Sequence, residues 1–176
     1  MNKLYLKYFK LLIIFTMIQI LILNEVMFSA YINPFLYILL IIMLPLKTPK
    51  WFLLTYAFCC GLFIDLFSSS LGFHSSATVL IAFLKPSISK ITIPHNILGE
   101  NDEIITHKIG IKAYLTFAFI LIFIHHLSLF FIEHLSFNFN ILIKTILSSL
   151  ISLIIILITQ QFFYRNKWKN IKLDTK

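Results

Sequence analysis

Six ionisable side chains lie inside, or at the edges of, the long apolar runs of this sequence. A charged group in an apolar medium is costly, so each is a candidate for binding a ligand or for moving a proton. Their residue types would suit either role, and their spacing decides which chemistry is feasible. The six are Asp65, His74, His125, His126, Glu133 and Lys144.

The spacing matches no catalytic or metal-binding motif. No set of His, Cys, Asp and Glu residues has metal-ligand spacing, and the sequence contains no nucleophile-elbow, Walker A or zincin motif. Cys59 and Cys60 are adjacent within an apolar run, where a thiol usually behaves as a small hydrophobic group. We therefore expect no enzymatic activity, no cofactor and no bound metal.

The composition indicates the environment of the chain. Of its 176 residues, 59% are hydrophobic and only 12% are charged, whereas a soluble domain has about 25% charged residues. The net charge of +8 comes from residues that lie between and beyond the apolar runs, where positive charge sets membrane topology. We therefore expect an integral membrane protein in contact with lipid, and no nucleic-acid partner.

Six apolar segments predict an all-α, polytopic membrane helix bundle that forms a single domain over residues 1–176. A straight span needs about 20 residues. The second and fourth segments are shorter, so each could extend into flanking polar residues or form a broken or tilted helix. Residues 85–112 are expected to form a polar cytoplasmic connector, which is solvated or lies on the membrane surface through its Ile residues. The predicted helices cover about 8–23, 31–46, 51–67, 71–84, 113–132 and 138–163.

The distribution of basic residues predicts the orientation. With the N-terminus in the cytoplasm, 14 of the 15 Lys and Arg residues fall on the cytoplasmic side, Lys85 among them, and Lys144 is the exception. A bias of Lys and Arg in short loops fixes orientation. We therefore expect both termini in the cytoplasm.

In this orientation the ionisable groups share the outer half of the membrane, which predicts a polar patch facing outward. His126 and Glu133 are seven residues apart on one helix face and could be linked through water, and Lys144 could pair with Glu133 or with Asp65. His125 points about 100° away from His126, so both cannot face one site equally. The predicted patch comprises His74, His126, Glu133 and Lys144.

Asp65 has two interpretations. Its carboxylate could accept hydrogen bonds from backbone N–H groups of the following turn and of the next helix, where negative charge is stabilised. It could instead act directly on a ligand or a proton. We adopt the capping interpretation, and the second one stays open.

Small residues predict where two helices meet. Ala57 and Gly61 are four apart on the third segment, and the fourth segment is also rich in small residues. Such residues let membrane helices approach closely. We expect the third and fourth segments to form a tight hairpin, with Ser75 and Ser76 in the contact.

One stretch resembles a known family. The run Gly61-Leu62-Phe63-Ile64-Asp65-Leu66-Phe67-Ser68, followed by Leu71-Gly72-Phe73-His74, is similar to the MreD family of rod shape-determining bacterial membrane proteins. The preceding prolines, at positions 34, 45 and 49, give a context similar to members from Bacteroidetes. The resemblance is strongest over residues 19–86, and beyond them only hydropathy and length agree. The matching motif positions are Gly61, Asp65, Ser68 and Gly72.

The resemblance implies a multi-pass protein of the bacterial inner membrane that acts without catalysis. It implies a scaffold in the cell-wall elongation complex, which contains a bitopic MreC-like protein, a RodA-like glycosyltransferase and its transpeptidase, with MreB on the cytoplasmic side. It also implies a fold like the substrate-binding subunits of energy-coupling-factor transporters. That likeness keeps a second function open, a solute-binding subunit of a vitamin-type transporter, because one bundle can host binding or scaffolding.

Overall fold

The computed structural model describes residues 2–24, 32–70, 72–94, 97–99, 102–136 and 138–173. The chain is 79% helical, and the described residues form no strand. The elements are α1 (Asn2–Ile18), which continues as the π-helix η1 (Gln19–Leu23), then α2 (Ile38–Ile42), α3 (Lys50–Ser68), α4 (Phe73–Thr92), α5 (Thr106–Ile109), α6 (Ile111–His134) and α7 (Phe139–Leu173).

Four helical stretches among the described residues are long and apolar enough to cross a membrane. They lie in α1 with η1, in α3, in α6 and in α7, at Tyr5–Leu23, Lys50–Ser68, Ile111–His134 and Phe139–Phe163. The prediction of an all-helical chain with several helices that could span a membrane is thus confirmed. The fourth predicted segment forms α4, a 20-residue helix that extends into polar residues and carries Lys85 and Pro86.

The second predicted segment, 31–46, is a broken helix in its described part, one of the forms that its short length allowed. Residue 31 lies outside the described part of the chain, residues 32–35 are not helical, and the helix α2 has only five residues. Pro34 and Pro45 flank this helix and have no N–H group to continue one. Every side chain from Phe35 to Leu44 is at most 6% exposed, so the broken segment fills the centre of the protein.

The hairpin of α3 and α4 is confirmed. A Cβ atom built on Gly61 would lie 2.3 Å from Cα of Ser75, so only glycine allows this approach. The hydroxyl of Thr78 donates to the carbonyl of Ala57 across the contact, at 2.9 Å. Ser76 was predicted in the contact and is not there: it is exposed, and its hydroxyl donates to the carbonyls of Gly72 and Phe73 in its own chain segment.

The connector over residues 85–112 is more than a solvated loop. Its first eight residues belong to α4, and Glu103, Ile104 and Thr106 are buried. The N–H of Ile104 donates to the carbonyl of Met43 at 3.2 Å, and the hydroxyl of Thr106 donates to Gln160 in α7 at 2.8 Å. The described part of this connector therefore closes one end of the bundle.

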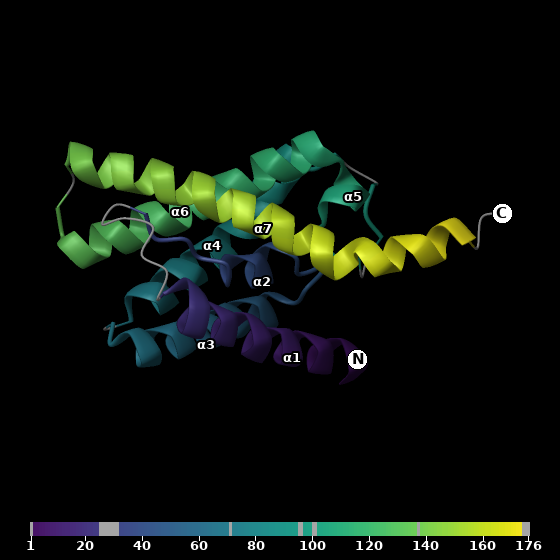
Figure 1. Ribbon diagram of the computed structural model, residues 1–176, viewed down its shortest axis with the longest axis horizontal. Helices are drawn as coiled ribbons and strands as arrows, with labels where there is room; N and C mark the ends of the chain where they lie inside the picture. The colour runs from purple at the N-terminus through teal and green to yellow at the C-terminus, as the bar shows by residue number, and fades with distance from the viewer. Residues whose placement is uncertain are drawn as a thin grey trace.

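The helices lie roughly along the long axis of the molecule (Figure 1). The beginning of α1 and the C-terminal part of α7 lie toward the same end, together with α5. The turn between α3 and α4 and the connection between α6 and α7 lie toward the opposite end. The short helix α2 occupies the middle, between α7 and α1.

Candidate functional site

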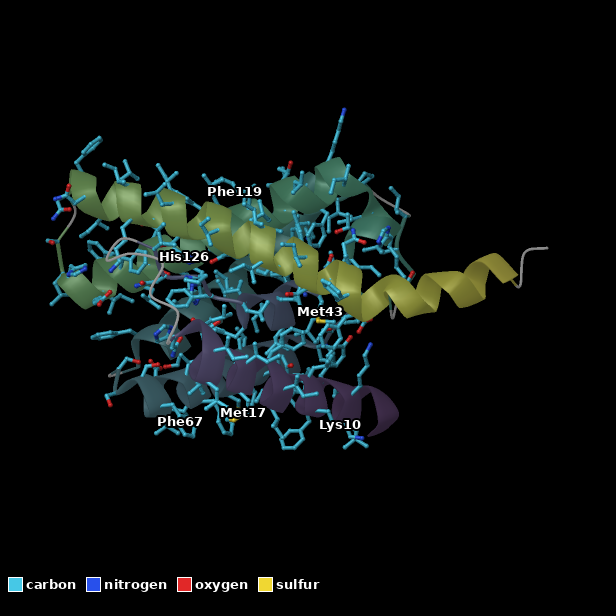
Figure 2. All side chains as sticks on the ribbon, viewed as in Figure 1. Lys10, Met17, Met43, Phe67, Phe119 and His126 are labelled. Carbon is cyan, nitrogen blue, oxygen red and sulfur yellow. The ribbon has the colours of Figure 1, made fainter. Side chains whose placement is uncertain are left out.

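Three of the six ionisable groups, His74, His125 and His126, converge on the part of the broken segment that precedes α2. Tyr37 stands at its centre: its Oη lies 2.7 Å from Nδ1 of His74 in α4 and 3.0 Å from Nε2 of His125 in α6. His126 lies beside them in the interior (Figure 2). We call Phe35, Tyr37, His74, His125 and His126 the central cluster.

Phe35 packs against all three imidazoles of the central cluster. Its ring centroid lies 5.1 Å from that of His74, 5.7 Å from that of His125 and 5.0 Å from that of His126. Its contact with His126 is stacked, and the other two contacts are edge-on, both of which are favourable aromatic geometries. One aromatic ring therefore packs against residues from two different helices.

The hydrogen bonds of the central cluster have a direction. His125 is fully buried, and its Nδ1 has no hydrogen-bond partner. A proton on Nδ1 would have no hydrogen-bond acceptor. In the neutral ring the proton therefore belongs on Nε2, which then donates to the hydroxyl oxygen of Tyr37. The Tyr37 hydroxyl is left free to donate to Nδ1 of His74. This chain joins α6, the broken segment and α4.

Polar side chains also satisfy the non-helical backbone before α2. In a membrane interior, an irregular backbone is tolerated only where the protein itself supplies partners. The amide of Gln19 donates to the carbonyl of Pro34 at 3.0 Å and accepts from the N–H of Leu36 at 2.7 Å. The N–H of Phe35 donates to the hydroxyl of Ser152 in α7 at 2.9 Å. The segment is thus bonded to helices on both sides.

Lys85 supports the other end of α2. It is 2% exposed, and its Nζ donates to the carbonyls of Ile41 and Leu44 at 2.8 and 2.6 Å. The last carbonyls of a helix have no partner within it, and Nζ of Lys85 supplies a donor there. Counting Lys85 among the loop charges was therefore wrong.

Asp65 makes the contacts expected of a cap. One carboxylate oxygen accepts from the N–H of His74 at 3.0 Å and from the hydroxyl of Ser70 at 2.6 Å, and the other accepts from the N–H of Ser75 at 2.9 Å. Gly72 enters α4 with a φ of +84°, a value at which glycine costs little. Of the four matched motif positions, Asp65 and Gly72 thus shape this turn, and Gly61 lies at the contact of α3 with α4.

The remaining motif position, Ser68, lies apart from the carboxylate. It is exposed, and its hydroxyl accepts from the amide of Asn24 at 3.2 Å. Ser70, which the sequence did not single out, is the serine that contacts Asp65.

The predicted outward patch is not one site. His74 and His126 are at most 8% exposed and belong to the central cluster, whereas Glu133 and Lys144 lie near the connection of α6 and α7. Their Oε2 and Nζ atoms are 3.9 Å apart, and Lys144 also lies over the ring of Phe130. His126 is instead engaged by the carbonyl of Ile122 and the hydroxyl of Ser152, so it is not paired with Glu133.

His125 and His126 both reach the central cluster but do not face it equally, as the angle of about 100° between them predicts. Both rings contact Phe35, because an aromatic side chain between them reaches two directions on the helix surface. They differ in their polar partners: His125 bonds to Tyr37, and His126 lies 3.2 Å from Ser152 Oγ.

Sequence reasoning missed several residues of the site. Buried polar side chains within apolar helices are a signal for interhelical bonding, and this signal was present at each missed helical position. The residues are Gln19, Lys85, Ser152 and Ser148, whose hydroxyl accepts from the N–H of Asn33 at 3.0 Å, together with Phe35 and Tyr37 from the broken segment.

No family model, curated protein or solved structure matches this chain. The described residues also contain no group of three or more His, Cys, Asp and Glu residues placed to hold a metal ion. The interpretation of the site rests on its own geometry.

Proposed function

We propose that the protein is a non-catalytic membrane scaffold of the cell-wall elongation complex, in the manner of the MreD family that its sequence resembles. One observation carries the proposal: the motif run that gives the resemblance builds the α3–α4 hairpin. Asp65 accepts the first N–H groups of α4, and Gly61 sets the helix separation. These contacts favour a rigid scaffold over a protein that changes shape during a catalytic or transport cycle.

The filled centre of the bundle supports a scaffold over a solute-binding subunit. The segment from Phe35 to Leu44 is buried in the centre of the bundle, where a bundle could otherwise enclose a solute. The polar groups that could bind a solute form hydrogen bonds with this segment instead. His74 and His125 bond to Tyr37, and Lys85 bonds to carbonyls at the end of α2. The solute-binding function remains the alternative outcome of the test below.

We also propose that the chain is a multi-pass protein of the bacterial inner membrane with both ends in the cytoplasm. The beginning of α1, helix α5 and the C-terminal part of α7 lie toward the same end of the molecule (Figure 1). This arrangement supports an orientation in which both ends are on one side of the membrane. We expect reporter fusions after Phe67 and Glu133 to be periplasmic, and fusions after Lys50, Gly99 and Lys176 to be cytoplasmic. A periplasmic signal from the fusion after Lys176 would contradict the orientation.

The partners under this proposal are an MreC-like bitopic protein, a RodA-like glycosyltransferase and its transpeptidase, with an MreB filament beneath. Depletion of the protein from a rod-shaped host should round or swell the cells, because elongation would lose its scaffold. Cell width and uptake of labelled vitamins would be measured in the same cultures. Loss of uptake of one solute with normal shape would favour the transporter alternative.

A further inference from the structure

Three helix ends carry a lysine next to an exposed apolar side chain. In each pair the lysine is exposed, and the apolar residue is between 51% and 86% exposed. Both halves of each pair are therefore accessible to a molecule outside the chain. The pairs are Lys50 with Trp51 at the beginning of α3, Lys90 with Ile91 near the end of α4, and Lys112 with Ile111 at the beginning of α6.

The three pairs lie toward the same end of neighbouring helices. Helix α4 packs against both α3 and α6. The turn between α3 and α4 and the last turn of α6 lie toward one end of the molecule (Figure 1). The beginning of α3, the end of α4 and the beginning of α6 therefore lie toward the other end. We call the residues 50–51, 90–91 and 111–112 the basic rim.

The lysines of the basic rim have no carboxylate partner among the described residues. The acidic residues of α3, α4 and α6 are Asp65 and Glu133, and both lie toward the opposite end of the molecule. The two described carboxylates of the connector each pair with another lysine, Asp102 with Lys108 and Glu103 with Lys7. The positive charge of the basic rim is thus left for an anion outside the chain.

A lipid with an anionic head group matches both halves of each pair. A lysine side chain can lay its stem along an apolar surface while its ammonium group reaches the polar layer. Tryptophan favours the level of the head groups, and cations at a membrane surface attract anionic lipids. An acidic peptide would match the lysines but would leave the exposed apolar residue beside each of them unexplained.

From these observations we propose that the basic rim binds anionic phospholipids. The ammonium groups lie at the head-group phosphates, and Trp51, Ile91 and Ile111 pack on the adjoining part of the acyl chains. A zwitterionic lipid has a cation of its own beside its phosphate, so the rim selects lipids with net negative charge. The binding depends on membrane insertion and not on the scaffold function or on the side that this end faces, so either proposal can fail without the other.

Trp51 reports which lipids lie at the basic rim. The chain has 2 tryptophans, so Trp168→Phe leaves Trp51 as the only one. This variant of the full chain would be reconstituted into phosphatidylcholine vesicles. The vesicles would contain a minor fraction of either dibrominated phosphatidylglycerol or dibrominated phosphatidylcholine, because bromine quenches tryptophan fluorescence on contact.

We expect the anionic lipid to quench Trp51 as strongly as a roughly fivefold larger fraction of the zwitterionic lipid, as one lysine near the membrane surface would give. Both leaflets have the same composition, so the direction of insertion does not affect the result. Equal quenching by the two brominated lipids would overturn the proposal.

Single charge changes in the same background assign the selectivity to residues. Lys50→Gln removes the cation next to Trp51. The matched control is Lys108→Gln, which removes the same charge from an exposed lysine that already pairs with Asp102. We expect Lys50→Gln to lose most of the excess quenching and Lys108→Gln to keep it. Equal loss in both variants would make net charge the cause and would contradict the proposal, as would no loss in Lys50→Gln.

The other two helices are tested by the amount of phosphatidylglycerol that the protein retains in detergent, measured by native mass spectrometry. Lys90→Gln and Lys112→Gln should each retain less of this lipid than Lys108→Gln does. Retention in both variants equal to that of Lys108→Gln would overturn a binding surface that extends over three helices.

Discussion

Asp65→Leu is expected to lose most of its folded protein, whereas Asp65→Asn is expected to keep it. Leucine leaves the N–H groups of His74 and Ser75 without their acceptors, and each unpaired buried donor costs about 1–3 kcal/mol. The total is a large part of the roughly 5–15 kcal/mol by which proteins are stable. Asparagine retains one acceptor oxygen, so its melting temperature should lie between those of the leucine variant and the unaltered protein.

Thermal unfolding in detergent and the amount of protein in the membrane would be measured for both variants. Asp102→Leu is the matched control, since Asp102 is a partly exposed carboxylate that pairs with Lys108 outside the bundle core. It should unfold within a few degrees of the unaltered protein. A leucine variant at position 65 that is as abundant and as stable as this control would show that the cap contributes little.

Gly61→Ala is expected to prevent α3 and α4 from closing. The added Cβ would lie 2.3 Å from Cα and 2.5 Å from N of Ser75. These are backbone atoms, which cannot move without their helix. Separation of the helices would also lengthen the bond from Thr78 to Ala57. Overpacking costs about 1–3 kcal/mol or more, and we expect the upper end here.

The control for this substitution is Gly99→Ala, where the nearest atom to an added Cβ is a side-chain oxygen of Asp102 at 3.2 Å. That side chain can move, so the variant should behave like the unaltered protein. Both variants would be compared by yield after membrane extraction and by retention on size-exclusion chromatography. Normal yield and a normal elution volume for Gly61→Ala would contradict the close approach.

The hairpin could be predicted from sequence because its causes are local. A glycine and small residues on adjoining helices indicate close packing, and an acid a few residues before the next helix indicates a cap. Asp65, Gly61 and Ala57 were therefore placed correctly. Ser76 was misplaced because small size does not reveal which face of the helix a serine occupies.

The centre of the bundle could not be predicted because it depends on contacts distant in sequence. Hydropathy alone cannot distinguish a spanning helix from an apolar segment buried inside the protein, so residues 31–46 looked like a span. Lys85 looked like a loop charge because its partners, the carbonyls of Ile41 and Leu44, are more than 40 residues away. Separations of 37 and 88 residues likewise hid the bonds from Tyr37 to His74 and His125.

We propose that this chain maintains cell shape through a fixed structure in which Asp65 accepts hydrogen bonds and does not exchange protons or ions. The most direct measurement is the cell width of a rod-shaped host that is depleted of its own copy and supplied with Asp65→Asn. Asparagine cannot ionise but keeps an acceptor, so we predict that rods are restored at a membrane level of the variant equal to that of the unaltered protein. An Asp65→Asn protein that is abundant and folded, yet leaves the cells round, would contradict the claim.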